Sequence, residues 1–120
     1  MNSPARILLI DKALDRKERI NALKSRGYAV FPALRMEEAR SRCLRGNYDL
    51  IVVNADGDYE QAAQFCDEIR RQCPKQQLIL CSDGQANRDY AVSSDVSSVM
   101  QAVESVLGKN TKAADIAKAA

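Results

Sequence analysis

The chain alternates between short continuous apolar runs and stretches in which apolar residues recur every three or four positions. Residues 7–10 and 50–53 are unbroken apolar runs rich in strand formers, which is typical of parallel strands buried on both faces. Further runs at residues 28–33, 78–81 and 90–92 predict three more strands. We therefore expect five strands, of which the first and third are the most deeply buried.

Between these runs, apolar residues follow the three-to-four spacing of a helix with one buried face. The four stripes are, in chain order, Ile20 and Leu23; Met36, Ala39 and Cys43; Ala62, Phe65, Cys66 and Ile69; and Val96, Val99, Met100, Val103 and Leu107. Asp15 and Glu18 have the spacing of a capping box, which predicts the start of the first helix. The four helix ends are expected at Gly27, at Gly46 and Asn47, at Pro74 and at Gly108.

Strands and helices alternate along the chain, which predicts an α/β sandwich with a largely parallel sheet. A chain of 120 residues suits one domain. We place that domain at residues 1–108 and expect the Ala- and Lys-rich residues 109–120 to form a frayed helix or a disordered tail. No apolar run approaches the ~20 residues of a membrane span, so we expect no membrane partner.

Charge is unevenly distributed, although the net charge is only +2. Residues 1–50 carry eleven Lys and Arg against six Asp and Glu, and residues 51–108 carry four against nine. The predicted domain is therefore neutral overall but polarised, which argues against a broad nucleic-acid-binding surface.

The chain has four cysteines and no histidine, and the cysteines form no C-x-x-C pair. These absences exclude the usual zinc patterns and any histidine-based catalytic triad. Cys43, Cys66 and Cys81 fall at apolar positions, so we expect reduced, buried thiols. A redox role for Cys73, near a helix end, is the alternative for that residue.

Three polar residues follow predicted strands and are therefore site candidates. They are Asp11, Asn54 and Ser82. In doubly wound sheets, ligands bind outside the carboxyl ends of the strands, where these three side chains are expected to meet. Each alone is also a common turn or cap residue, so the hypothesis depends on their joint placement. Asn54, Asp56 and Asp58 also alternate loosely like a calcium loop, but they lack its glycine position and terminal glutamate.

In order and spacing, the motifs of residues 5–108 resemble the receiver domain of bacterial two-component response regulators. They are Arg6-Ile-Leu-Leu-Ile-Asp11, Leu23-Lys-Ser-Arg-Gly-Tyr28-Ala-Val30, Glu37-Glu-Ala39, Tyr48-Asp-Leu-Ile-Val-Val-Asn54, Glu68-Ile-Arg70, Leu78-Ile-Leu-Cys-Ser82 and Asp89-Tyr-Ala-Val92. The resemblance implies a flavodoxin-like three-layer sandwich, a mainly parallel five-stranded sheet of order 2-1-3-4-5, and a cytoplasmic signalling protein.

The groups that carry phosphotransfer in that family are mostly replaced. Of the acidic pair that holds Mg²⁺, Asp11 is present and Lys12 replaces the other member; an ammonium there repels the metal. Asn54 replaces the phosphoacceptor aspartate, and a neutral amide cannot form an acyl phosphate. The small hydroxyl residue is retained as Ser82, and Ser93 replaces the expected lysine, whose space Lys12 could partly fill. We expect a degenerate phosphorylation pocket, no cofactor and no Mg²⁺ site.

Only residues 83–89 separate the last two predicted strands, whereas a parallel crossover usually takes a dozen residues or more. The fourth helix of the family is therefore expected to be missing. A bare loop could still cross, because seven extended residues reach roughly 23 Å. Alternatively, the last strand is displaced, lost or antiparallel.

The leading functional hypothesis is a pseudo-receiver that signals by binding a protein partner, such as a kinase or an output protein, without aspartyl phosphorylation. The alternative is a ligand- or metal-responsive regulator that uses Asp11, Asn54 and Ser82. An enzyme is disfavoured, since the chain has no Gly-rich phosphate loop and no nucleophile elbow. Opposite charges could also dock partners or copies head to tail, through Arg35, Arg40, Arg42 and Arg45 at one edge and Asp83, Asp89 and Asp95 at the other.

Overall fold

The computed structural model describes residues 3–82 and 92–108 and contains the predicted alternation of strands and helices. In chain order the elements are β1 (Arg6–Ile10), α1 (Arg16–Ser25), β2 (Ala29–Ala33), α2 (Met36–Arg45), β3 (Leu50–Asn54), α3 (Tyr59–Gln72), β4 (Leu78–Ser82), β5 (Val92–Ser93), α4 (Val96–Val103) and a π-helical turn η1 (Glu104–Gly108). None of the helices within these ranges is long and apolar enough to cross a membrane.

The strands form one five-stranded sheet of order β2-β1-β3-β4-β5, and every pairing in it is parallel. This is the predicted flavodoxin-like sheet. Strand β5 is described at residues 92–93 and pairs in parallel with the end of β4, while residues 90–91 of the predicted strand lie outside the described residues. A displaced, lost or antiparallel last strand is therefore excluded. The prediction of a missing fourth helix concerns residues 83–89, which lie outside the described residues.

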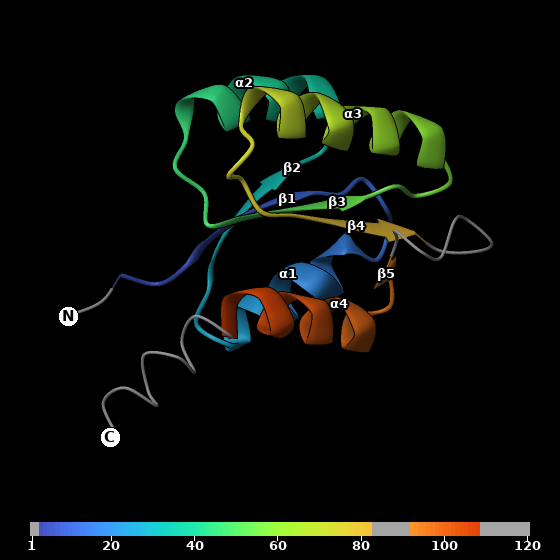
Figure 1. Cartoon of the computed structure of the whole chain (residues 1–120). Coiled ribbons are helices and arrows are strands. Elements are labelled where there is room, and N and C mark those ends of the chain that lie inside the picture. Colours follow the sequence, from blue (N-terminus) through green and yellow to red (C-terminus); the bar gives the residue numbers. More distant parts are fainter. Residues whose placement is uncertain (1–2, 83–91, 109–120) are drawn as a thin grey trace.

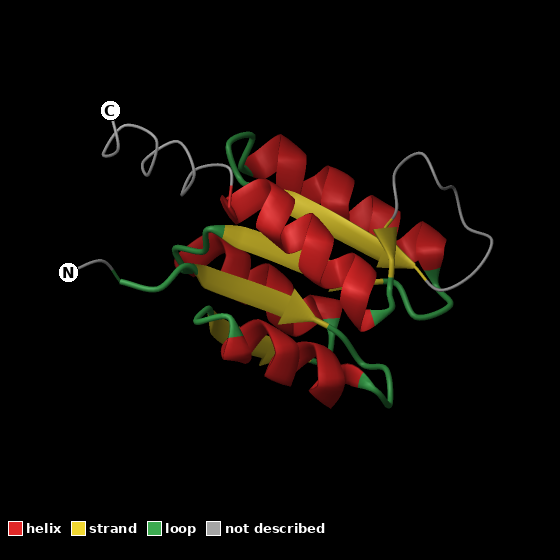
Figure 2. Cartoon of the chain, turned by 90° about the horizontal axis from the view of Figure 1, so that it is seen from below, coloured by secondary structure: helices red, strands yellow, loops and turns green. Residues whose placement is uncertain are grey.

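Helices cover both faces of the sheet, with α2 and α3 on one face and α1 and α4 on the other (Figure 1). Figure 2 shows α1 and α4 crossing over the strands from their own side. Because successive side chains of a strand point to opposite faces, β1 divides between the two cores. Leu8 and Ile10 pack with the α2/α3 layer, while Ile7 and Leu9 pack with the α1/α4 layer.

The predicted helical stripes form these cores, with some members half-buried. Phe65 and Ile69 of α3 are 0% and 1% exposed, and Val99 and Val103 of α4 are 0% exposed. A fully buried aliphatic or aromatic side chain contributes about 1.5–3 kcal/mol. The stripes therefore fix α3 and α4 against opposite faces of one sheet.

The first helix begins at the predicted place but not by the predicted mechanism. Asp15 is the N-cap residue of α1, yet its side chain makes no capping hydrogen bond. The carboxylate instead lies 2.6 Å from Nη2 of Arg19, so the capping-box expectation is wrong in its chemistry. The stop at Gly27 is confirmed, since its φ of +91° is a conformation that glycine adopts at little cost.

Strand β2 forms the outer edge of the sheet beside β1. Its residue Pro32 has no backbone N–H, and Nη1 of Arg42 on α2 donates a hydrogen bond of 2.9 Å to the carbonyl oxygen of Pro32. One outward-facing position of this edge is thus already bonded within the chain.

The four cysteines are free thiols, and Cys43, Cys66 and Cys81 are buried as predicted. Burial raises the pKa of Cys43 and of Cys66 to about 11 and that of Cys81 to about 12. Cys73 is only partly buried, and its proposed redox role stays a prediction.

Candidate functional site

Two of the three predicted site residues meet at the carboxyl edge of the sheet. Asp11 directly follows β1, Asn54 ends β3, and the side-chain Nδ2 of Asn54 donates a hydrogen bond of 3.1 Å to Oδ1 of Asp11. The two side chains are 3% and 5% exposed. They meet because β1 and β3 are neighbours in the sheet and Ile10 is paired with Val53. The next residues, Asp11 and Asn54, therefore lie side by side at the carboxyl edge.

The two predicted serines lie further along the same edge. Ser82 ends β4 and is paired with Ser93 of β5. The hydroxyl of Ser93 donates a hydrogen bond of 2.6 Å to Oδ1 of Asp95, the N-cap residue of α4. Neither serine is among the residues that line the pocket containing Asp11 and Asn54. That Ser82 and Ser93 share one pocket with Asp11, Lys12 and Asn54 stays a prediction.

A buried arginine, Arg19 of α1, occupies the centre of the site. Its Nε donates a hydrogen bond of 2.6 Å to Oδ2 of Asp11, and its Nη2 lies 3.2 Å from Oδ1 of the same carboxylate. Nη1 donates a third hydrogen bond, of 2.9 Å, to the backbone carbonyl of Ser94. One side chain thereby joins the end of β1 to the segment between β5 and α4.

The charge of Arg19 is compensated on two sides. Burial opposes its charged form, but the hydrogen bonds to Asp11 and Asp15 outweigh burial and raise the pKa of the guanidinium above its ordinary value. The hydrogen bond to Arg19 also lowers the pKa of the exposed Asp15 carboxyl. The guanidinium is a permanent cation, and its planar fork matches a carboxylate better than an ammonium does.

The carboxylate of Asp11 has a full set of partners. Besides Arg19 and Asn54, the backbone N–H of Ala13 donates a hydrogen bond of 3.0 Å to Oδ1. Oδ1 thus lies within hydrogen-bond distance of three donors, and Oδ2 holds the short bond to Nε of Arg19. A metal ion at Asp11 would have to compete with these donors, of which the buried guanidinium is the only one with a full positive charge.

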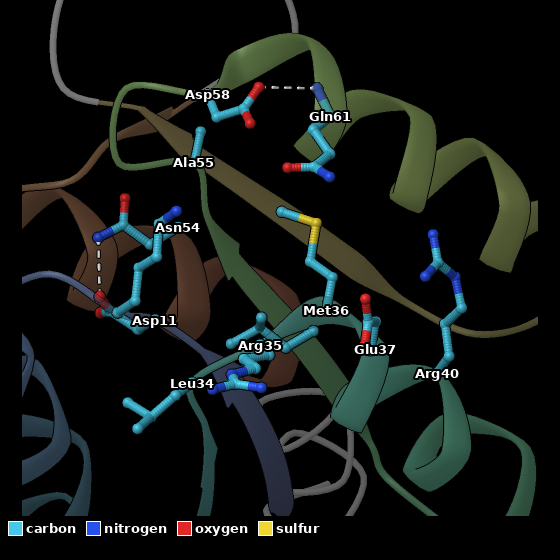
Figure 3. A pocket seen from close by; sticks show the side chains of 12 residues that line it. Asp11, Leu34, Arg35, Met36, Glu37, Arg40, Asn54, Ala55, Asp58 and Gln61 are labelled. Carbon is cyan, nitrogen blue, oxygen red and sulfur yellow. Dashed lines mark hydrogen bonds between the residues drawn. The ribbon is translucent and has the colours of Figure 1, made fainter.

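Beside this ion pair lies a pocket of about 250 Å³ between the N-terminal ends of α2 and α3. Its lining residues are Ile10, Asp11, Lys12, Leu34, Arg35, Met36, Glu37, Arg40, Asn54, Ala55, Asp58 and Gln61. Figure 3 shows Asn54 and Asp11 on one side of it and Leu34, Arg35 and Met36 on the other. The carboxylate of Asp58 accepts a hydrogen bond of 3.3 Å from the backbone N–H of Gln61 and so caps α3.

The amide of Asn54 is only half satisfied. Its nitrogen is bonded to Asp11, whereas Oδ1 is buried and has no hydrogen-bond partner among the described residues. A buried acceptor without a donor costs about 1–3 kcal/mol. Native proteins seldom leave such an acceptor unpaired, because a water molecule or a ligand can supply the missing donor.

The predicted basic edge is partly neutralised within the chain. Arg40 forms an ion pair of 2.8 Å with Glu68 of α3, and Arg42 forms one of 3.0 Å with Glu38. Arg45 lies within 3.4 Å of the Ser41 hydroxyl, and Arg35 lines the pocket. On the acidic side, Asp95 caps α4, while Asp83 and Asp89 lie outside the described residues. Head-to-tail docking stays a prediction.

The sequence reasoning missed Arg19, although a signal was present. Arg19 precedes Leu23 by four residues and therefore shares the buried face of α1. It also follows Asp15 by four residues, the spacing of an ion pair on a helix. The cation beside Asp11 is thus Arg19, whereas Lys12 is exposed.

No protein-family model and no curated protein sequence matches the chain. Solved structures do match. A CheY-like response regulator receiver domain from Methanospirillum hungatei JF-1 superposes with a TM-score of 0.73 at 17% identity, covering 92% of this chain and 98% of that one.

Response regulator TrrA from Thermotoga maritima, in complex with Mg²⁺ and BeF, superposes with a TM-score of 0.72 at 22% identity and covers 85% and 98% of the two chains. The same regulator in complex with the histidine kinase ThkA gives 0.69 at 24% identity, with 86% and 98% covered. These similarities show that the chain has the fold of response regulator receiver domains, as its motifs predicted.

Proposed function

We propose that this chain is an atypical receiver module of signal transduction that acts by binding a protein partner, without aspartyl phosphorylation and without catalysing a reaction of its own. The observation that carries the proposal is the occupied Asp11 carboxylate, which Arg19 holds through two hydrogen bonds within the protein. A receiver that cycles through phosphorylation needs this carboxylate to bind a metal ion. Here the carboxylate is bonded to the permanently charged guanidinium of Arg19.

The residues present do not fit Mg²⁺. Mg²⁺ demands about six oxygen ligands in near-ideal octahedral geometry. Here Asp11 is committed to Arg19, an exposed lysine stands next to it as Lys12, and Asn54 offers one neutral oxygen. TrrA has been crystallised in complex with Mg²⁺ and BeF. We propose that this chain, in contrast, binds no Mg²⁺ at Asp11.

The proposed partner is a signalling protein in the cytoplasm, such as a kinase or an output protein. The support is the fold, because a regulator of the same fold is found in complex with a histidine kinase. The hydrogen bonds of Arg19 also support a binding surface that keeps one conformation and does not switch between two. They tie Asp11 to Ser94 at the start of the α4 segment without any ligand.

The test is incubation with acetyl phosphate and Mg²⁺, followed by intact mass measurement. We expect no phosphate adduct. A stoichiometric adduct in the native chain that is absent from Asn54→Ala would overturn the proposal.

A second candidate function is a ligand-responsive regulator, and one observation favours it. The pocket of about 250 Å³ is lined by Asn54, whose buried Oδ1 has no hydrogen-bond partner among the described residues. It differs from the expected ligand site, because the lining omits Ser82 and adds Arg35 and the first turn of α2. A thermal-shift comparison with and without candidate ligands separates this function from the first.

A further inference from the structure

We propose that the pocket between the N-terminal ends of α2 and α3 binds a small organic anion that also carries a hydroxyl or amine group. The proposal rests on the second candidate function and names its ligand class. It does not depend on whether the chain can be phosphorylated. Four features carry it: the cations in the lining, the start of α2, the amide of Asn54, and the size and walls of the pocket.

Two of the cations in the lining are available to a ligand. Lys12 and Arg35 are exposed, and neither has an ion-pair partner within residues 3–82 and 92–108. Arg40 is already paired with Glu68, and Asp11 is neutralised by Arg19. Besides Asp11, the acidic side chains of the lining are Asp58, which caps α3, and Glu37. The formal charges of the lining therefore balance, and the two unpaired cations offer an anion two places to bind, of which Arg35 adjoins the start of α2.

The start of α2 adds donors on the same side. This ten-residue helix begins at Met36, and its N-cap residue Arg35 makes no side-chain capping bond to the amides of the first turn. Arg35, Met36 and Glu37 line the pocket. Unbonded first-turn N–H groups and the positive end of the helix dipole attract anions. A carboxylate or phosphate group placed here would meet the amides and the guanidinium together.

Asn54 supplies the second half of the recognition. It lies in the opposite wall (Figure 3) and is 5% exposed, and its Oδ1 has no donor within the part of the chain that the structure describes. An anionic oxygen cannot satisfy an acceptor, whereas a hydroxyl or amine hydrogen can. The ligand therefore needs a donor group at the end remote from its charge.

Size and walls limit the carbon skeleton. A volume of about 250 Å³ lies just below the ~300–1,000 Å³ of drug-sized sites, which suits a compact metabolite. Ile10, Leu34, Met36 and Ala55 give the pocket apolar wall area. Short hydroxylated or aminated carboxylates and phosphate monoesters fit this combination, and the experiment distinguishes the two anionic groups.

The experiment is amide NMR titration of the whole chain with two matched pairs of probes. Malate and succinate differ by one hydroxyl on a dicarboxylate, and glycerol 3-phosphate and methyl phosphate contrast a hydroxylated with a plain phosphate monoester. We expect saturable shifts in the segments around Arg35 and Asn54 with at least one hydroxylated probe. We also expect weaker binding of its partner without the hydroxyl.

Variants assign the contacts. Arg35→Ala should weaken binding about tenfold or more, because a charge-assisted contact is lost. Arg45→Ala, on the same helix but outside the pocket, should leave binding unchanged. Asn54→Ala should remove the preference for the hydroxylated probe. The amide spectra report in the same samples whether each variant is folded.

Two results would overturn the proposal. One is the absence of saturable shifts with all four probes at millimolar concentration. The other is binding that Arg35→Ala leaves unaltered. Equal binding of hydroxylated and plain probes would overturn the role of Asn54. None of these results bears on the acetyl phosphate test, so the two proposals fail separately.

Discussion

Nε of Arg19 lies 2.6 Å from Oδ2 of Asp11, and both side chains are almost completely buried. Asp11, which the resemblance to receiver domains matches to one of their Mg²⁺-holding acids, is therefore engaged by a guanidinium from the first helix. The same guanidinium donates a hydrogen bond to the carbonyl of Ser94, so the pair joins the end of β1 to the segment between β5 and α4.

Arg19→Met is expected to destabilise the fold by about 3–5 kcal/mol, because it leaves the Asp11 carboxylate buried without its cation. The measurement is urea unfolding followed by circular dichroism. Lys17→Met, on the exposed face of the same helix, is the matched control and should change stability by less than about 0.5 kcal/mol.

Replacing both partners tests the mechanism of that loss. Arg19→Met combined with Asp11→Leu removes the unpaired charge and should be more stable than Arg19→Met alone. If the double variant is as unstable as the sum of the single variants, the buried charge is not the cause.

Asn54→Asp is expected to be less stable than the native chain at neutral pH, by about 1–3 kcal/mol. The new carboxylate would stand where Nδ2 now lies 3.1 Å from Asp11, and like charges at that distance raise the pKa of the introduced carboxyl. A raised pKa makes the penalty appear as pH rises through the ordinary value of about 3.9 and disappear on acidification.

Urea unfolding of Asn54→Asp and the native chain across this pH range gives the comparison. A stability difference that does not change with pH would contradict the prediction. The variant should also gain no phosphate adduct from acetyl phosphate and Mg²⁺, since Arg19 still holds Asp11.

Asp95→Ala should lower the melting temperature at neutral pH. Asp95 caps α4, and its bonds from the Ser93 hydroxyl and from the backbone and side chain of Ser98 lower its pKa from 3.8 to about 2. A depressed pKa stabilises the fold above 3.8 and loses this contribution as pH falls toward 2. Thermal unfolding of native and variant chains should therefore converge in acid. Parallel curves at all pH values would refute the assignment.

In the native protein, Cys73 should be the first cysteine to react with a thiol reagent such as Ellman's reagent. Cys43, Cys66 and Cys81 are buried with raised pKa values, and the thiolate is the reactive form. We expect one fast phase that Cys73→Ser removes. A fast phase that survives this substitution would show that another thiol opens readily.

Arg40→Ala should change stability by less than about 1 kcal/mol, because its ion pair with Glu68 is exposed. Phe65→Ala, beneath the same arginine, should cost about 3–5 kcal/mol. Urea unfolding at low and high salt checks both, and only the Arg40 effect should shrink with salt. A large, salt-independent loss for Arg40→Ala would mean that its packing on Phe65 dominates.

The sheet and its helices could be predicted from the sequence because the apolar runs and stripes are long and regular. The runs at 7–10 and 50–53 specify central parallel strands, and their neighbours follow from the chain order. Strand β5 is described only at residues 92–93, and so short a segment has no periodicity from which its bounds could be predicted.

The site was predicted only in part because it depends on contacts between distant segments. The meeting of Asp11 and Asn54 follows from parallel register, which the sequence indicates. The bond from Arg19 to the carbonyl of Ser94 joins residues 75 positions apart through a backbone atom, and no pattern in the sequence marks it. The pocket likewise combines Arg35, at the start of α2, with Asn54, at the end of β3, through the packing of α2 on the sheet.

The outer edge of β2 limits how copies of this protein can assemble. Ala33 of β2 accepts a bond from Asp11 beyond β1, so residues 30 and 32 present their backbone groups outward. At position 32 no N–H exists and the carbonyl is bonded to Arg42. A strand added to this edge would therefore lack a donor and an acceptor for its backbone hydrogen bonds at position 32. Continuation of the sheet from molecule to molecule, the geometry of fibrils, is therefore disfavoured on this side.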